Sequence, residues 1–218
     1  MVQVVGILGF KGSGKDTAGD FLVREHGFVL DSFANPLKDA ISAVFGWERD
    51  LLEGSTSESR IWREQPDEWW ESKLDWSSHP ARVLSPRFTP RIALQYFGTE
   101  VFRGHFHNDI WILSLENRLR GKDKVVLTDC RFPNEFKVIK GMKGLAFRVV
   151  RGPEPDWYSD ACLAANGSEE HIRLMEKVGV HSSEWAWLTQ DFDAVIENNG
   201  TIKDLEKNVE CLILNHFS

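Results

Sequence analysis

The sequence predicts an α/β fold built around a parallel sheet, on three observations. A short apolar, β-branched run, VQVVGIL at 2–8, ends directly in a glycine-rich turn. Segments with helical spacing then alternate with further apolar runs, which is the rhythm of a doubly wound domain. Continuous apolar runs are typical of parallel strands that are buried on both faces. Five segments of this kind are expected to be strands: 2–8, 28–33, 124–129, 145–151 and 194–198.

Two helices in the first part of the chain have clear boundaries. The first strand leads into a predicted helix at 15–27, and the second into one at 34–46. Each ends in a glycine, Gly27 or Gly46, the residue most often found just past the last helical turn. Pro36 stands in the first turn of the second helix, where proline is tolerated.

Residues 47–88 interrupt this alternation. The segment holds five of the nine tryptophans, and its part 47–76 has nine acidic against four basic side chains. It is too long for a structureless loop inside a compact domain, so we expect a mostly helical insertion within a single domain of 1–218. The aromatic residues have two interpretations. They form either a satellite core, which burial statistics favour, or a lid over a nucleotide. The lid would use Trp69, Trp70, Arg60 and Arg63.

After the insertion the alternation resumes. Thr89 is a good N-cap and Pro90 a good first helical residue, so a helix is expected at 89–103. Residues 153–193 are expected to be irregular with helical stretches. Further helices are predicted at 109–121, 134–144 and 201–214.

Composition excludes several classes of protein. The net charge of −7 leaves no electrostatic footprint for duplex DNA, so no nucleic-acid partner is expected. No apolar run approaches the ~20 residues that span a bilayer, and no membrane partner is expected. The three cysteines are scattered, without a metal-ligand pattern, which favours reduced thiols in a cytoplasm over a structural zinc.

The residues after the first strand, GFKGSGKDT at 9–17, match the first seven positions of the P-loop pattern. Glycines let the backbone curl so that consecutive N–H groups point at phosphate oxygens. The following helix N-terminus adds a favourable dipole, and Lys15 can reach the β- and γ-phosphates. A dinucleotide-binding interpretation of Gly12 and Gly14 fails because Thr17 occupies the third glycine position.

One position departs from the general P-loop pattern. The residue after the lysine is Asp16, and a hydroxyl follows one position later at Thr17. A metal ion can then be held by either side chain or through their waters. Asp16 can alternatively hold the acceptor side of the site.

A second motif, VVLTDCR, ends in Asp129 and Arg131. An acid at the carboxyl end of a buried strand suits a magnesium contact. Arg131 is expected over the same edge of the sheet, where ligands of open α/β sheets bind. The simpler alternative is that Asp129 caps the next turn and Arg131 is a surface residue.

Phosphoryl transfer needs positive charge around the phosphates. Lys38 opens the second helix, a natural place for the phosphate of an acceptor. Arg91 begins the helix at 89–103, and Gln95, one turn further on, can hydrogen-bond a base edge. For each of these residues a solvated surface position is the common alternative. The candidate cations are Lys11, Lys15, Lys38, Arg91, Arg103, Arg131 and Arg151.

Seven motifs in sequence order resemble those of the deoxynucleoside monophosphate kinases of bacteriophages. They are GFKGSGKDT, NPLKDA, QYFGTEVFR, VVLTDCRFPNE, FRVVRGPE, HSSE and DAVIENNGT. The GKDT and D-x-R elements are also similar to those of eukaryotic phosphomevalonate kinase. The resemblance implies the P-loop kinase fold: three α/β/α layers, a five-stranded parallel sheet and mobile lids.

The resemblance also implies a reaction and a site. ATP and Mg²⁺ would be the cofactors, and a deoxynucleoside 5′-monophosphate the acceptor, supplying dNTP precursors for phage DNA synthesis in the host cytoplasm. The catalytic residues implied are Lys15, Asp16 and Arg131, with Asp16, Thr17 and Asp129 at the metal. The ATP phosphates would lie on Lys11, Gly12, Ser13, Gly14, Lys15, Asp16 and Thr17, and the acceptor near Lys38, Arg91, Gln95, Asp129 and Arg131.

Arg151 and Glu184 match family positions and are also assigned to the substrate by the resemblance. For Glu184 and His181 of the HSSE motif, a satisfied loop is the alternative. A homodimer and the identity of the accepted bases are left open. Two other functions remain at this point: a P-loop kinase with a non-nucleotide phosphate acceptor, and a P-loop NTPase acting as a switch or motor.

Overall fold

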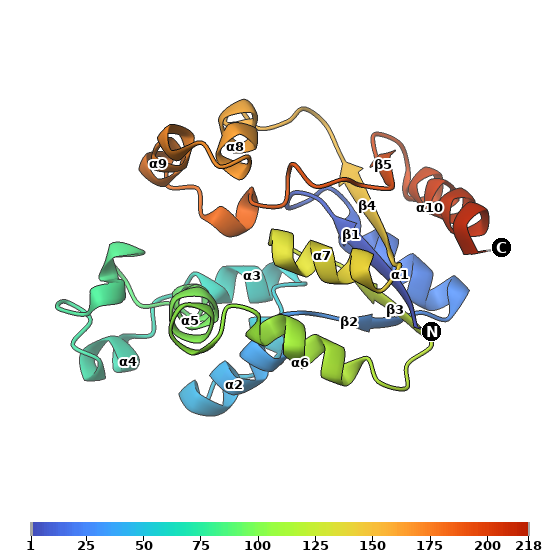
Figure 1. The fold of residues 1–218 in the computed structure, drawn as a ribbon. Coiled ribbons are helices and arrows are strands. Elements are labelled where there is room, and N and C mark those ends of the chain that lie inside the picture. The colour runs from blue at the N-terminus through green and yellow to red at the C-terminus, as the bar shows by residue number, and fades with distance from the viewer. Residues whose placement is uncertain (1, 218) are drawn as a thin grey trace. The chain divides into compact units, whose positions relative to one another are not determined.

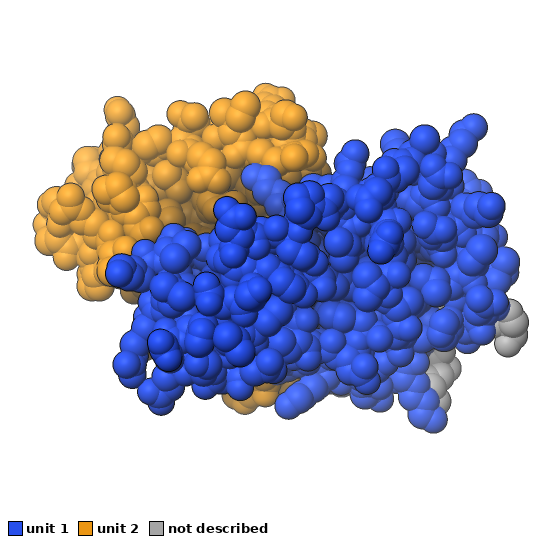
Figure 2. Space-filling model, turned by 90° about the horizontal axis from the view of Figure 1, so that it is seen from above, with its two compact units in different colours: residues 1–33, 115–218 blue, residues 34–114 orange. Residues whose placement is uncertain are grey.

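A computed structural model describes residues 2–217, and the chain divides into two compact units, coloured separately in Figure 2. Unit 1 combines residues 1–33 with 115–218 and contains the whole sheet. Unit 2 is 34–114, so it includes the predicted insertion at 47–88 together with the helices on either side. The single domain predicted for 1–218 stays a prediction.

The sheet of unit 1 has the predicted five parallel strands, each inside its expected segment. They are β1 (Gln3–Leu8), β2 (Val29–Asp31), β3 (Lys124–Leu127), β4 (Leu145–Val150) and β5 (Ala194–Glu197). The spatial order is β2-β3-β1-β4-β5, and all neighbours pair in parallel. The chain leaves β1 toward one side of the sheet and later crosses to the other between β3 and β4. The carboxyl end of β1 is therefore at the switch point where ligands bind in such sheets.

Helices cover both faces of this sheet (Figure 1). The helices of unit 1 are α1 (Lys15–His26), α7 (Pro133–Gly141), α8 (Tyr158–Ala165), α9 (Glu169–Val178) and α10 (Ile202–Phe217). Buried side chains of α1 and α10 pack with Val5 and Ile7 in one core cluster. Gly6 faces the opposite layer, where a Cβ would lie 2.6 Å from the side chain of Ile139 in α7. No helix in the described part of the chain is long and apolar enough to cross a membrane.

The regular secondary structure described in unit 2 is helical and consists of a series of short elements joined by turns and loops. They are α2 (Asn35–Phe45), α3 (Ser57–Arg63), α4 (Glu68–Lys73), α5 (Pro90–Gln95), a π-helix (Tyr96–Phe106) and two 3-10 turns (Asp50–Leu52, Pro80–Val83). A sixth helix, α6 (Ile110–Arg118), runs from unit 2 into unit 1.

The helix predicted at 89–103 begins as expected but changes its winding. Thr89 is the N-cap, and its Oγ1 accepts a hydrogen bond from the Ile92 N–H at 3.2 Å. From Tyr96 the helix continues in the wider π form and ends at Phe106. π-helical turns are rare and frequently accompany functional sites, and sequence spacing alone does not predict them.

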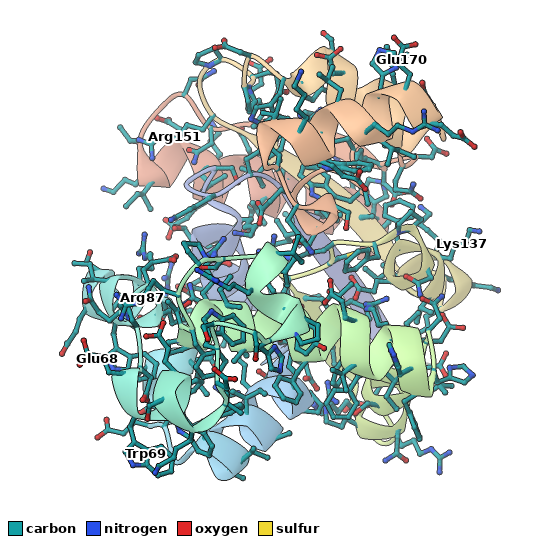
Figure 3. The ribbon with its side chains drawn as sticks, turned by 90° about the vertical axis from the view of Figure 1, so that its left-hand side faces the viewer. Glu68, Trp69, Arg87, Lys137, Arg151 and Glu170 are labelled. Atoms are coloured by element: carbon teal, nitrogen blue, oxygen red, sulfur yellow. The ribbon has the colours of Figure 1, made fainter. Side chains whose placement is uncertain are left out.

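The aromatic residues of the insertion form mainly a satellite core in unit 2. Trp47 stacks on Phe45 with ring centroids 4.6 Å apart, and Trp76, 4% exposed, packs on Phe88 at 5.0 Å. Trp69 differs, because it is 59% exposed and projects from the edge of the view in Figure 3.

Candidate active site

The glycine-rich turn lies between β1 and α1, as predicted. Gly12 and Gly14 have φ values of +84° and +101°, a region that side chains other than glycine rarely adopt. The Ser13 N–H donates to the Phe10 carbonyl at 3.1 Å, which closes the turn. The sequence therefore folds here into a curled backbone at the carboxyl edge of the sheet.

The N-terminus of α1 is open for an anion. Its N-cap is Gly14, and no side chain caps the first turn. In the described part of the chain the Gly14 N–H has no hydrogen-bond acceptor. Unsatisfied N–H groups and the helix dipole make such a terminus a ready site for phosphate. Lys15 is beside it, with Nζ 3.4 Å from the carboxylate of Asp16, whose side chain is 72% exposed.

Phe10 anchors the turn in an aromatic cluster. Its ring lies 5.4 Å from that of Trp157 and 5.2 Å from that of Trp187. The guanidinium of Arg148, on β4, lies 6.0 Å above the Phe10 ring and 5.2 Å from the ring of Tyr158. The phosphate loop is thus fixed to the segment that carries α8, through contacts that the P-loop pattern does not include.

Asn198 also contacts the loop, and sequence reasoning missed it. It follows β5, is 7% exposed, and its Nδ2 donates to the Ser13 carbonyl at 2.8 Å. The neighbouring Asn199 accepts a hydrogen bond from the Gly152 N–H at 2.9 Å. In the sequence this asparagine pair indicates only a turn.

Asp129 lies just beyond β3, the strand next to β1, and its carboxylate binds the end of β2. It accepts hydrogen bonds from the Ser32 hydroxyl at 2.5 Å and from the Phe33 N–H at 3.1 Å. The alternative in which Asp129 only caps its own turn does not describe these contacts. They fix the carboxylate at the edge of the sheet where the phosphate loop also begins.

Helix α1 packs closely on the segment that leads from β3 to Asp129. A Cβ on Gly19 would lie 2.7 Å from Cγ2 of Thr128, the residue before Asp129. Asp16 stands one turn before Gly19, so it shares that face of the helix. Glycine at position 19 thus permits the close approach of helix and strand.

Arg131 and Glu184 form an ion pair in the structure. Nη1 of Arg131 donates to Oε1 of Glu184 at 2.9 Å and to the Ser183 carbonyl at 3.3 Å. The loop that carries Arg131 is shaped by Glu135, whose buried carboxylate accepts the N–H groups of Arg131 and Phe132 at 2.7 and 3.1 Å. Glu135 is a second residue that was missed, although a glutamate two residues after a helix-initiating proline is the N3 position of a capping box.

Cys130, between Asp129 and Arg131, has a buried thiol of low reactivity. Burial raises the pKa of its thiol well above the ordinary value, and the nearby carboxylates of Glu135 and Asp129 raise it further. Since the thiolate is the reactive form, Cys130 is a packing residue and not a nucleophile.

The other predicted residues belong to unit 2 or are exposed, except Thr17, which is half-buried in the first turn of α1. In unit 2, Lys38 Nζ lies 2.5 Å from Glu53, and Arg91 Nη1 lies 3.5 Å from Glu64. Gln95 closes α5 and is half-buried. In unit 1, Arg151 and Lys11 are exposed, Arg151 at the edge of the view in Figure 3.

The described residues contain no group of three or more His, Cys, Asp and Glu side chains that could hold a metal ion. The predicted set of Asp16, Thr17 and Asp129 consists of two carboxylates and a hydroxyl. These are oxygen donors of the kind that Mg²⁺ prefers, and Mg²⁺ usually keeps several waters and phosphate oxygens besides one or two carboxylates. The residues present therefore fit that ion.

Comparisons with known proteins bear on this site. No protein-family model matches the chain. A protein of Acanthamoeba polyphaga mimivirus named "Putative deoxynucleotide monophosphate kinase" is 28% identical over 219 residues, covering 94% of this chain and 93% of the relative. The deoxynucleoside-5′-monophosphate kinase of Escherichia phage T5 is 26% identical over 182 residues, covering 64% of this chain and 72% of that protein.

Among solved structures, shikimate kinase from Aquifex aeolicus is 10% identical with a TM-score of 0.42, covering 99% of this chain and 98% of that one. A likeness at this level carries no argument about function. The sequence relatives do bear on the predicted resemblance, and they confirm it: over nearly its whole length, the chain is similar to deoxynucleotide monophosphate kinases.

Proposed function

We propose that this chain transfers the γ-phosphoryl group of ATP to deoxynucleoside 5′-monophosphates, giving ADP and the deoxynucleoside diphosphate. The observation that carries the proposal is the open, glycine-rich turn at the carboxyl end of the central strand. The similarity of the chain to two proteins named deoxynucleotide or deoxynucleoside monophosphate kinase, over 94% and 64% of its length, supports the class of acceptor.

In the proposed reaction, an oxygen of the acceptor's phosphate bonds to the γ-phosphorus of ATP, and the bond from that phosphorus to the bridging oxygen of ADP breaks. The acceptor oxygen is already anionic, so no base is needed to remove a proton. The protein's work is to position the two phosphates and to neutralise their charge. N–H groups at the start of α1 hold the ATP phosphates, and Lys15 stays with the transferred group.

Arg131 is the second cation proposed for the reacting phosphates. Its side chain is 40% exposed and is held by Glu184, so it is oriented before a ligand arrives. Asp16, Thr17 and Asp129 would hold Mg²⁺. That ion would neutralise charge on the phosphates of ATP.

The acceptor is proposed to be held by Lys38 and Arg91, with Gln95 at the base and Arg151 and Glu184 contributing to substrate binding. Lys38 and Arg91 each already have a carboxylate partner in unit 2. No observation favours a non-nucleotide acceptor or a switch or motor over this reaction. A homodimer and a cytoplasmic location remain predictions.

A coupled assay of ADP release tests the proposal. The protein is given ATP and Mg²⁺ with dAMP, dGMP, dCMP or dTMP separately, and with the ribonucleotides as controls. Turnover with at least one deoxynucleotide supports the proposal and defines the base specificity at the same time. Absence of turnover with all of them, while ATP still binds, contradicts the choice of acceptor and leaves the phosphate loop intact.

A further inference from the structure

We propose that Asn198 is a positioning residue of the phosphate loop, which turns the N–H of Gly14 toward the bound phosphates. The inference deepens the proposed function and rests on one part of it, that the loop holds a nucleotide's phosphates. It does not depend on which acceptor is phosphorylated.

The position of Asn198 is fixed by backbone and side chain together. It follows β5, and its own N–H donates to the Val150 carbonyl at the end of β4, at 2.8 Å. Its side-chain Nδ2 donates to the Ser13 carbonyl at 2.8 Å, and the residue is only 7% exposed. The hydrogen bond therefore joins the rigid carboxyl edge of the sheet to the middle of the phosphate loop.

This hydrogen bond determines which way one peptide group faces. The peptide between Ser13 and Gly14 is planar and trans, so its C=O and N–H point in opposite directions. Because Asn198 holds the Ser13 oxygen on the side of the sheet, the Gly14 N–H is directed to the other side. That N–H has no acceptor in the described part of the chain, as expected of a donor reserved for a ligand.

The contact also accounts for glycine at position 14. A Cβ at position 14 would lie 2.3 Å from Nδ2 of Asn198, and real Cβ atoms essentially never come so close to another heavy atom. The φ of +101° at Gly14 independently disfavours any side chain. Loop and asparagine are thus fitted to each other, and only a side chain that donates a hydrogen bond can hold this peptide.

The test compares Asn198→Asp with Asn199→Asp. Aspartate at 198 keeps the shape of the side chain and the backbone N–H that donates to Val150, but it has no side-chain N–H to donate to Ser13. Aspartate at 199 adds the same charge one residue away and keeps the oxygen that accepts from Gly152. The measurements are the calorimetric affinity for ADP, the KM values for ATP and for the acceptor, and the melting temperature without ligand. Asn198→Ala is the second variant, which removes the donor without adding charge.

We expect both Asn198 variants to bind ADP about tenfold or more weakly and to raise the KM for ATP, with the KM for the acceptor within twofold. In Asn199→Asp, the ADP affinity and the KM for the acceptor should stay within twofold of the wild-type values. In the wild type, the Gly14 amide resonance should shift when inorganic pyrophosphate is added, and this shift should shrink in Asn198→Ala.

Several outcomes overturn the proposal. One is ADP affinity within twofold of wild type in both Asn198 variants. Another is an equal weakening of ADP affinity and of the KM for the acceptor together with a lowered melting temperature, because a merely structural role would give that result. A failure of the proposed function gives a different result: no deoxynucleotide is turned over, while the wild type still binds ADP and the Asn198 variants are still compared by their ADP affinity. A wild type that binds no ADP overturns the inference itself.

Discussion

The phosphate loop of unit 1 and the basic side chains of unit 2 differ in how far their positive charge is neutralised by neighbouring carboxylates. In the loop, N–H groups at the start of α1 have no side-chain cap, and the ion pair of Lys15 within residues 2–217 is a 3.4 Å contact with its exposed neighbour Asp16. In unit 2, Lys38 and Arg91 are each bound to a carboxylate. The positive charge of the loop has a weak counter-ion, whereas the cations of unit 2 have close carboxylate partners.

The acidic stretch at 47–76 explains the second arrangement. It supplies Glu53, which binds Lys38 and Arg49, and Glu64, which binds Arg91. Burial raises the pKa of Glu53, but hydrogen bonds and charge from Lys38 and Arg49 lower it by more, so the net pKa is below the ordinary value. The excess of acids in this segment is therefore partly a set of counter-ions for the cations of unit 2.

The largest effect is expected from removing the open charge of the loop. Lys15→Ala should lower kcat/KM by at least about a hundredfold, the range found when one donor to a developing negative charge is removed. The melting temperature should change little, because the ion pair of the ammonium among the described residues is a long contact with the exposed Asp16. Steady-state kinetics with a thermal melt checks both. Near-normal turnover would remove the basis of the comparison.

Arg131→Ala should come next, with kcat lowered about a hundredfold, the lower end of the loss found when one donor to a developing negative charge is removed. Glu184→Gln should lower kcat only a fewfold, because its amide oxygen can still accept from Arg131, which now donates at 2.9 Å. Kinetics of the two variants side by side distinguish the roles. Equal losses would mean that Glu184 contacts the substrate itself.

Lys38→Ala tests whether compensated charge in unit 2 still serves the acceptor. We expect the KM for the deoxynucleotide to rise about tenfold, because one hydrogen bond to a charged group is lost, and kcat to stay nearly unchanged. Glu53→Gln is the matched control and should not raise that KM, because it leaves the cation in place. If Lys38→Ala lowers only the melting temperature, the ion pair is purely structural.

An ion pair inside unit 1 gives a reference for such compensated charge. Asp31, 5% exposed, accepts from Lys122 at 2.7 Å and from Arg118 at 3.1 Å. Burial raises the pKa of Asp31, but these hydrogen bonds and that of the Ser32 N–H outweigh it, so the folded pKa is lowered. Its stabilisation is therefore fully present above the unfolded pKa, about 4, and is lost as the pH falls through the folded value.

Asp31→Asn should accordingly lower the free energy of unfolding by about 2 kcal/mol at pH 7, typical of hydrogen bonds to a charged group. The difference from wild type should shrink below about pH 4. Urea unfolding at several pH values measures it. A difference that is constant with pH would show that the charge of Asp31 contributes nothing.

The smallest effect is expected at Trp69, which is 59% exposed. Trp69→Ala should change the free energy of unfolding by less than about 0.5 kcal/mol, as surface substitutions usually do. Trp76→Ala, at a side chain that is 4% exposed, is the contrasting control and should cost about 3 kcal/mol. A rise in the KM for ATP in Trp69→Ala would instead support the lid interpretation.

The same contrast explains what the sequence could predict. The strands and the turn at 9–17 follow from local chemistry: apolar runs, glycines and a lysine at fixed spacing. Three contacts of the site depend on the fold: Lys38 pairs with Glu53, Arg131 with Glu184, and the Ser13 carbonyl with Asn198. No spacing rule relates residues 13 and 198, so the contact of Asn198 with the loop could not be read from the pattern.

Local rules also fall short within single elements. Thr89 and Pro90 correctly predicted the start of α5, because capping is a matter of neighbouring residues. The change to a π-helix at Tyr96 was not predicted. Likewise, Pro66 separates α3 from α4, so the predicted helical insertion is a row of short helices.

The core of unit 1 has a consequence for how this chain is made. Leu205, Val209 and Ile213 of α10 pack with Val5 and Ile7 of β1, about two hundred residues earlier in the chain. β1 also has β3 and β4 as its neighbours in the sheet, so each of its pairings is non-local. Non-local contacts slow folding, and during synthesis the apolar residues of β1 stay exposed until their partners have been made. A chain stopped before α10 would leave Val5 and Ile7 without the side chains of Leu205, Val209 and Ile213 that complete this core cluster.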